Sequence, residues 1–410
     1  MATDSLAIID RALKIRYSKT INMMMNNSAQ NIEKLFTDKS ETANWAGERV
    51  VEQLIQFSLP EGFGASRELS TTPTPGNSTY DTYKIRMKYE NAVGEISAQV
   101  INTKKGEGSF INGMSAAINN VMETAKRETA RMNYAAINGA LCRTNGILAI
   151  GATTTITDDA LGYTQAVGGN KHIRPGMIIA YVDPATGLII TTTTVVTVDQ
   201  TGGSTFTTTP LAVGVADNSI VTRCNVLGTT DVGSVGFGNE PLGIGSIVDN
   251  GGFGTQYQEL SRTTYPILQS RVNNVAGAIS SDLILRENDI AAQRGGGQVD
   301  AYFMHHSVRR AYVALIYAAP RFNYSSSPVT ADTGPSVLKK DNYLEFGGIR
   351  LYEDFLAPAG TQFAVQMDQM EKYVWIDGEM ATEGGSSLTK VPNKDAYNFL
   401  WRRWRNFHYK

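Results

Sequence analysis

Two kinds of hydrophobic pattern follow one another along this chain of 410 residues. In residues 82–89, apolar side chains take every second position and polar or basic side chains fill the positions between them. This alternation is typical of a strand with one solvent-exposed face. A turn at 90–94 and a return run at 95–101 complete a predicted hairpin. Because two strands alone are marginally stable in water, the hairpin needs a surface in this chain or in a neighbour.

Helical spacing dominates the segment that follows. Apolar residues form one stripe from residue 112 to 141, and charged residues such as Arg131 occupy the remaining positions. At 1.5 Å per residue such a helix would span about 40 Å, which predicts a spine rather than a short packed helix. Weaker helical spacing at 8–15 and 48–57 predicts short helices in an N-terminal arm.

Residues 151–230 form a Thr-rich segment with 19 Thr and only 8 charged residues. Its strand-like runs, rich in β-branched residues, are 177–182, 188–198, 205–209 and 219–223. Turn sequences such as the one beginning at Asp183 separate them. The pattern predicts a small β-barrel or sandwich inserted between two other parts of the chain.

The C-terminal part mixes helices and strands. Ser281 starts a predicted capped helix that ends at Gly295, and Ser307 caps a second one. The predicted strands of this part are 299–304, 349–352, 363–366 and 373–376. The tail from residue 397 to 410 is aromatic and basic. These alternating elements predict an α+β domain.

Charge and composition exclude several classes of protein. The formal net charge is −2, so the chain is no basic nucleic-acid condenser. Two Cys and four His leave no disulfide framework and little material for a metal centre. No apolar run is long enough to cross a membrane, and the N-terminus lacks the pattern of a secretory signal, so we expect a soluble protein kept inside a cell. Only 19% of the residues are charged, which fits surface that faces other protein chains.

Motifs for catalysis or cofactor binding are weak. Gly243 and Gly245 lack the third glycine of a dinucleotide-binding turn. His305 and His306 are adjacent and would point apart, and Asp158 with its neighbour lies in a Thr-rich loop without a third ligand. We therefore predict no enzyme activity, no cofactor and no metal.

Aromatic and basic residues interleave in the tail. Such a pattern can stack on single-stranded nucleic acid, but Trp and Arg are also enriched at protein–protein contacts. The balanced charge of the whole chain favours the second interpretation. The predicted subunit-contact residues, from the hairpin and the tail, are Tyr83, Arg86, Met87, Tyr89, Trp401, Arg403 and Trp404.

One stretch resembles a known family. A glycine-containing run beginning at Glu240 precedes Arg262, Tyr265 and Pro266, and this order is similar to a segment of tailed-bacteriophage major capsid proteins. The order of predicted elements also resembles the Hong Kong 97-type capsid fold, although the matching motif covers only about 30 residues. The resemblance implies an N-terminal arm (1–57), an extended loop hairpin (58–108), a peripheral domain with a spine helix (109–150 and 380–410), an inserted β-domain (151–227) and an axial domain (228–379).

The resemblance also implies a function and partners. The chain would assemble with copies of itself, as hexamers and pentamers, into an icosahedral shell around double-stranded DNA, without sequence-specific binding. A separate scaffolding protein, a portal protein and a decoration protein are the implied partners. The implied locations are the bacterial cytoplasm during assembly and the virion afterwards. The alternatives are the shell protein of an encapsulin-like bacterial compartment and, from another class, a hydrolase with a β-rich accessory domain.

Overall fold

The C-terminal segment forms the longest strand of the protein, β19 (Ala396–Tyr409), in the computed structural model. It lies between β4 (Lys88–Ser97) and β17 (Met370–Met380), and both pairs are antiparallel. The short strands β18 (Thr389–Lys390) and β1 (Thr37–Asp38) complete this five-stranded sheet. The structure describes residues 32–47, 49–98, 113–150, 153–156, 169–199, 204–211, 213–275, 277–318, 344–381 and 388–410.

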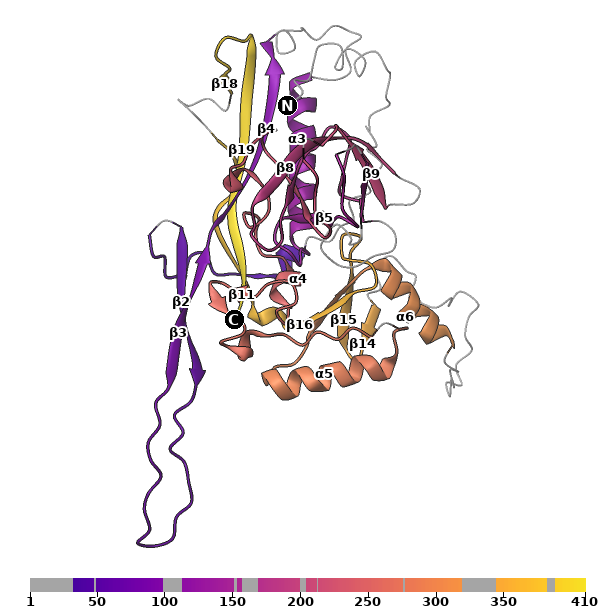
Figure 1. The fold of residues 1–410 in the computed structure, drawn as a ribbon. Coiled ribbons are helices and arrows are strands. Elements are labelled where there is room, and N and C mark those ends of the chain that lie inside the picture. The colour runs from indigo at the N-terminus through magenta and orange to yellow at the C-terminus, as the bar shows by residue number, and fades with distance from the viewer. Residues whose placement is uncertain are drawn as a thin grey trace, which may run out of the picture.

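A two-stranded arm projects from the body of the molecule (Figure 1). Its strands are β2 (Val50–Ser58) and β3 (Thr79–Arg86), which pair antiparallel with each other. The connecting loop forms the far end of the arm, and every residue from 58 to 75 is exposed. A ribbon of this kind cannot bury an apolar face by itself, so its outer part has no core.

The predicted hairpin within residues 82–101 is wrong. β3 pairs with β2, whereas β4 begins after a single intervening residue and pairs with β19. The predicted turn at 90–94 lies inside β4, where Glu90 is buried. Gly94 suits a strand here because a Cβ at this position would lie 2.2 Å from the ring of Phe399. Alternation identified extended chain at 82–89, but it missed the break at Met87 between β3 and β4 and carries no information about which strand pairs with which.

The two helices predicted in the N-terminal arm differ in outcome. The one at 48–57 is wrong, because this segment forms β2. Its β-branched residues favour a strand once a partner is present, and Val51 is buried opposite Ile85 of β3. The helix predicted at 8–15 lies outside the described residues.

The long helix is shorter than predicted. α3 (Gly113–Met132) runs alongside β4 and ends well before residue 141. The amide of Tyr134 donates to a carbonyl only three residues back, which tightens the chain into a turn. Gly139 then has φ +81°, and a Cβ there would lie 2.1 Å from the carbonyl oxygen of Gly236. At the end of the helix itself, a Cβ on Gly243 would lie 2.6 Å from the carbonyl oxygen of Met132, so another segment closely approaches the chain where the helix stops.

Six strands form a second sheet with its own hydrophobic cluster, which includes Tyr181 and Phe206. In chain order they are β5 (Ala140–Arg143), β6 (Thr153–Thr155), β7 (Ile178–Val182), β8 (Ile189–Val198), β9 (Thr205–Thr208) and β10 (Ile220–Arg223). The four strands predicted in the Thr-rich segment are confirmed, and they pair in the order β5-β10-β7-β8-β9-β6. Threonine hydroxyls join neighbouring strands, as between Thr193 and Thr209 at 2.8 Å. The first strand of the sheet precedes that segment.

A four-stranded sheet and two helices form the third part. Its strands are β13 (Ala301–Met304), β14 (Leu344–Phe346), β15 (Ile349–Glu353) and β16 (Gln362–Val365), in the order β14-β15-β13-β16. The predicted helices are confirmed as α5 (Ser281–Gly295) and α6 (His306–Ala318). The cap of α5 is Ser280, whose hydroxyl accepts from the amide of Leu283, one residue before the predicted cap.

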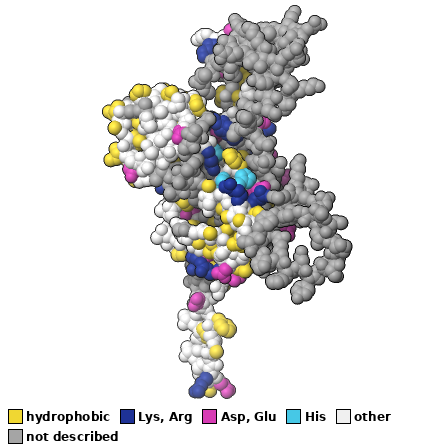
Figure 2. All heavy atoms as spheres, turned by 90° about the vertical axis from the view of Figure 1, so that its right-hand side faces the viewer, with side chains coloured by type: hydrophobic (Ala, Val, Ile, Leu, Met, Phe, Trp, Pro, Cys, Tyr) yellow, Lys and Arg dark blue, Asp and Glu magenta, His cyan; other side chains and the backbone are white. Residues whose placement is uncertain are grey.

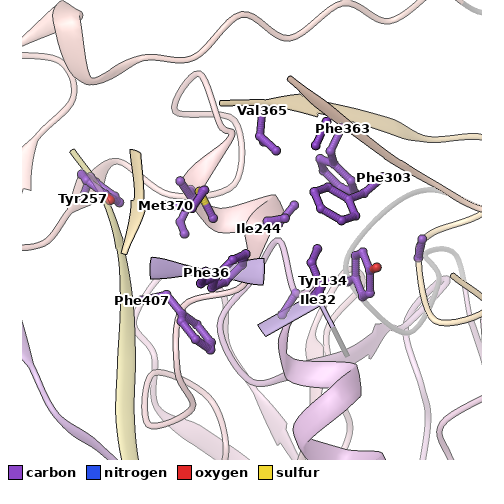
Figure 3. Packing of buried hydrophobic residues seen from close by; sticks show 14 of the residues in the cluster. Ile32, Phe36, Tyr134, Ile244, Tyr257, Phe303, Phe363, Val365, Met370 and Phe407 are labelled. Atoms are coloured by element: carbon purple, nitrogen blue, oxygen red, sulfur yellow. The ribbon is translucent and has the colours of Figure 1, made fainter. Parts of the chain in front are cut away.

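The main hydrophobic core joins the N-terminal segment, the end of α3, the third sheet and β19 (Figure 3). Its members include Ile32, Phe36, Tyr134, Ile244, Phe303, Phe363, Met370 and Phe407. Short elements around it are η1 (Ile32–Leu35), η2 (Val232–Ser234), α4 (Ile244–Ile247), β11 (Gln256–Tyr257), β12 (Leu260–Ser261), η3 (Pro266–Leu268) and η5 (Met367–Gln369). Segments from both ends of the chain therefore stabilise one core.

Candidate assembly surfaces

The histidine pair that the sequence singled out is held by local contacts. His305 Nδ1 lies 2.9 Å from the hydroxyl of Ser307, and His306 Nδ1 lies 3.2 Å from a carboxylate oxygen of Glu353. Within the ranges that the structure describes, no group of three or more His, Cys, Asp or Glu residues could hold a metal ion. None of the described helices is long and apolar enough to span a membrane.

Gly243 has a packing role. A Cβ on this residue would lie 2.4 Å from the backbone nitrogen of Ala135, so only glycine allows α4 to approach the end of α3 this closely. The amides of Ile244 and Ser246 donate to the carbonyls of Asn133 and Ala135 across the same contact. The aspartate pair at residue 158 lies outside the described residues.

Apolar side chains stand unprotected on the arm. The exposed fractions are 102% for Phe63, 102% for Leu69, 75% for Leu59 and 68% for Leu54. Figure 2 shows apolar side chains along the arm and charged ones at its end. A folded chain gains nothing from leaving several large apolar groups in water, so this surface suits contact with another molecule. Leu59, Phe63 and Leu69 lie in the predicted extended loop, and Leu54 lies in a predicted helix. None of the four was a predicted contact residue, although an aromatic residue inside a Pro- and Gly-rich turn was a usable signal.

The seven residues predicted as subunit contacts fall into two groups. Tyr83, Met87 and Trp401 are at most 7% exposed, so their side chains pack within the chain itself and present little surface to a neighbour. Arg86 forms an exposed ion pair with Glu259.

Arg403 pairs with Glu33 and Asp377, and only 13% of its side chain is exposed. Tyr89 and Trp404 lie opposite each other on β4 and β19, and their rings meet edge to face at 4.9 Å. Tyr89 is 40% exposed, so with Arg86 it is the more open part of the predicted set.

A buried ionic network anchors the N-terminal segment to the central sheet. Arg405 on β19 is fully buried, and its Nη1 lies 2.7 Å from Glu33 of η1 while its Nε lies 2.6 Å from Glu90 of β4. It also donates to the side chain of Asn133 and to the carbonyl of Thr129. Buried charges of this kind need several partners at once, because desolvation otherwise exceeds the attraction.

A second buried arginine extends this network toward the end of α3. Arg131 pairs with Glu128 at 3.0 Å and with Glu240 at 2.6 Å, and its side chain has no exposed surface. Burial alone would raise the pKa of Glu128, but the charges of Arg131 and Arg223 outweigh it and lower that pKa. Burial dominates at Glu240, whose pKa is raised despite Arg131. The two arginines thus tie η1, α3, β4 and β19 together by charge as well as by packing.

Because the side chain of His408 is buried, we expect the protein to lose stability in mild acid. Burial lowers its pKa to about 3, with a smaller contribution from Lys410, whereas the unfolded chain titrates near the ordinary value of 6.5. The unfolded state therefore binds more protons below 6.5, and this stabilising contribution is lost as the pH falls toward 3. At about pH 5 the loss from this one group is roughly 2 kcal/mol. Urea unfolding of the wild type and of His408→Gln at about pH 7.5 and about pH 5 measures it. The variant should lose less stability than the wild type between the two conditions, and equal losses would contradict the assignment.

Arg262, Tyr265 and Pro266, which carry the resemblance, occupy structural positions. Arg262 donates to Asp249 at 2.6 Å and to the carbonyl of Ser246 at 2.8 Å. Pro266 is the first residue of η3, where a missing amide hydrogen costs nothing. Tyr265 reaches out to the arm. The motif therefore fixes a turn of the body and connects it to the root of the arm.

Comparison with known proteins identifies the fold. The sequence matches no protein-family model and no curated protein. The structure is similar to a chain of the cyanophage A-1(L) capsid asymmetric unit, with 10% identity and a TM-score of 0.54, over 99% of this chain and 95% of that chain. It also matches a chain in the capsid of a native GTA particle, at 10% identity and a TM-score of 0.46 over 100% and 96% of the two chains. A chain of Microbacterium phage Oxtober96 matches at 11% identity and a TM-score of 0.45, over 100% and 93%. The cyanophage match shows that this chain has the mixed helix-and-sheet fold of a phage capsid chain along nearly its whole length.

Proposed function

We propose that this chain is the major capsid protein of a tailed double-stranded DNA bacteriophage, with the Hong Kong 97-type fold, and that it assembles into an icosahedral head. The observation that carries the proposal is the arm, which exposes large apolar side chains beyond any core of its own. Such a segment becomes stable when it lies on a neighbouring copy. The fold shared with a cyanophage capsid chain supports the same conclusion.

The proposal assigns a role to each part of the chain. Residues 1–57 are the N-terminal arm, 58–108 the extended loop, and 228–379 the axial domain. The projecting two-stranded arm overlaps the first two ranges because it includes β2, and β4 within the second range pairs with β19. The peripheral domain comprises 109–150 and 380–410, and 151–227 is an inserted β-domain. Arg86 and Tyr89 are the members of the predicted contact set that are open enough to meet a neighbour.

The composition of the chain fits a container. A net charge of −2 gives no strong overall attraction to phosphate, so the shell can enclose DNA without condensing it on its wall. We propose that it binds no particular DNA sequence. The partners we propose are copies of the same chain in hexamers and pentamers, a separate scaffolding protein, a portal protein and a decoration protein. The chain acts in the virion after assembly in the bacterial cytoplasm, and its role is structural rather than enzymatic.

Electron microscopy of the purified full-length chain tests this function. We expect closed polyhedral shells or isolated capsomers, because weak contacts repeated over many copies add up to a stable assembly. The chain is imaged alone and together with the scaffolding protein encoded by the same genome. A chain that stays monomeric at high concentration in both cases would contradict the proposal. Shells that enclose an enzyme rather than DNA when isolated from cells would favour a bacterial compartment.

A further inference from the structure

Near its base, the arm (β2 and β3) contacts the rest of the chain, which we call the body, at two positions along its length. At the inner level, Tyr83 of β3 is buried, and its ring meets the rings of Tyr257 and His408 with centroids 5.8 Å and 4.8 Å away. At the outer level, Phe57 of β2 stacks on Tyr265 of the body, with ring centroids 3.9 Å apart and planes 12° from parallel. The outer contact lies nearer the free end of the arm, so it has more influence on the direction of the arm.

Tyr265 also contacts the other strand of the arm. Its hydroxyl donates to Asp81 Oδ2 on β3 at 2.7 Å. This hydrogen bond, together with one from the amide of Thr82, lowers the pKa of Asp81, so the carboxylate is a charged acceptor at neutral pH. One side chain of the body therefore holds both strands of the ribbon, one by stacking and one by a charge-assisted hydrogen bond.

The body side of this contact is rigid. Tyr265 directly precedes η3, its amide donates to the carbonyl of Ser261, and its carbonyl accepts from the amide of Leu268. Three residues earlier, Arg262 is buried and bound to Asp249. Tyr265 is therefore presented from a fixed turn, whereas the arm that it holds is a thin ribbon.

The arm is free beyond Tyr265. In the described part of the chain, no hydrogen bond or ring contact joins the arm to the body further out, and Tyr80, next to Asp81, is 55% exposed. About ten extended residues separate this point from the tip, which is a lever of about 35 Å. A rotation of about 5° at the root moves the tip of such a lever by about 3 Å, most of a van der Waals contact distance. A small change in the direction of the arm at its root therefore moves the apolar tip away from the surface that it would contact.

We infer that Tyr265 is a positioning residue that sets the direction in which the arm leaves the body, and that this direction decides whether neighbouring copies close into a shell. The first half concerns the single chain, and the second half rests on the proposed capsid function. Tyr265 acts through Phe57 and Asp81.

Spin-label distances in the unassembled chain test the first half. Labels at Arg67→Cys near the tip and at Gln293→Cys on α5 report the distribution of arm directions by electron–electron double resonance. Cys142 and Cys224 are buried, so the introduced sites take the label. The measurement uses the full chain at a concentration where it is monomeric, and urea unfolding confirms that each variant is folded.

The variants separate the two contacts of Tyr265. We expect Tyr265→Ala to broaden the distance distribution about twofold, because both contacts are lost. Tyr265→Phe keeps the stack and should give an intermediate width, and Asp81→Asn should stay close to wild type because its amide oxygen still accepts. Tyr80→Ala, which removes an exposed tyrosine from the same ribbon, is the matched control and should leave the distribution unchanged. A narrow distribution in Tyr265→Ala with wild-type stability would overturn the inference.

Shell formation by the same variants tests the second half. The yield of closed shells from Tyr265→Ala should fall by about tenfold or more. Each shell contains many arms, and every one of them would point in a less defined direction. Tyr265→Phe and Asp81→Asn should each keep most of the wild-type yield of closed shells. A broadened distribution together with normal shells would overturn the assembly role alone. If the wild-type chain forms no shells, the capsid function and this second half fail together, and the distance distributions still decide the first half.

Discussion

Arg405→Ala should lower the free energy of unfolding by about 3–5 kcal/mol, because it leaves buried carboxylates without their shared partner. Arg405 has no exposed surface and pairs with both Glu33 and Glu90 at 2.7 Å and 2.6 Å. Removing it leaves two carboxylates, each under 10% exposed, with Arg403 as the remaining nearby cation for one of them. Urea unfolding of the unassembled chain, followed by circular dichroism, measures the loss.

Arg402→Ala is the matched control for this prediction. Arg402 lies on the same strand and pairs with Glu379, but 36% and 51% of the two side chains are exposed. Exposed ion pairs contribute at most about 1 kcal/mol, so this variant should stay near wild-type stability. Equal losses of unfolding free energy in Arg402→Ala and Arg405→Ala would show that the buried network stabilises the chain no more than an exposed ion pair does. A near-neutral Arg405→Ala would show that water or rearrangement compensates the two carboxylates.

Shortening the arm should abolish shell formation while leaving the single chain stable. The change replaces residues 59–78 with an Asn-Gly turn, which suits a two-residue hairpin connection. Ser58 and Thr79 are already paired, with their hydroxyl oxygens 3.0 Å apart, so the shortened ribbon closes without strain in the rest of the arm. Of the deleted residues, 59–75 and 77 are exposed and 76 and 78 are half-buried, and none belongs to a hydrophobic cluster of the described chain.

The expected effect on assembly is large. Burying one Leu or Phe contributes about 1.5–3 kcal/mol, and the deletion removes Leu59, Phe63 and Leu69 from every copy. Electron microscopy and sedimentation should show no closed shells, while the free energy of unfolding of the monomer, measured in urea, stays within about 0.5 kcal/mol of wild type.

Leu188→Ser is the control for the shortened arm, because Leu188 is 61% exposed but directly precedes β8 of the six-stranded sheet, away from the arm. This variant should assemble normally. Normal shells from the shortened chain would contradict the role of the arm.

Local pattern was informative wherever an element forms from its own residues. Helices α5 and α6 follow from helical spacing that starts near a serine and stops at a glycine or a break. The cap of α5 lies one residue before the predicted serine, and α6 begins at His306, one residue before Ser307. The strands of the Thr-rich segment follow from runs of β-branched residues. In these cases the propensity and the hydrophobic period agree, so the tertiary structure had little to add.

Local pattern failed wherever a distant segment decides the conformation. Residues 48–57 have apolar positions compatible with a helix, and they become a strand because β3 lies beside them. The apolar stripe of α3 continues past Met132, but the segment that contains Gly243 closely approaches the backbone of Met132 and Ala135, where the helix ends. The buried partner of Arg405, Glu33, lies 372 residues away in the sequence. No spacing rule connects two such positions.

The predicted contact residues also show that local pattern does not reveal which side chains become buried. An aromatic and basic tail predicted surface for partners, yet Trp401 is 7% exposed and Arg405 is fully buried. The tail became the central strand of a sheet, and its charges were neutralised inside by carboxylates from η1 and β4. The apolar residues of the arm, which were not predicted as contacts, are among the large apolar side chains left in water.

The sequence by itself determined the class of the chain. It established a mixed α and β protein with near-zero charge, a Thr-rich strand segment and an extended segment without a core, because composition and hydrophobic period are properties of the local chain. Only the tertiary structure decided which strands pair, where the long helix ends, and which side chains remain exposed. Pairing and burial depend on segments that meet across hundreds of residues, and the free energy of those contacts outweighs local propensity.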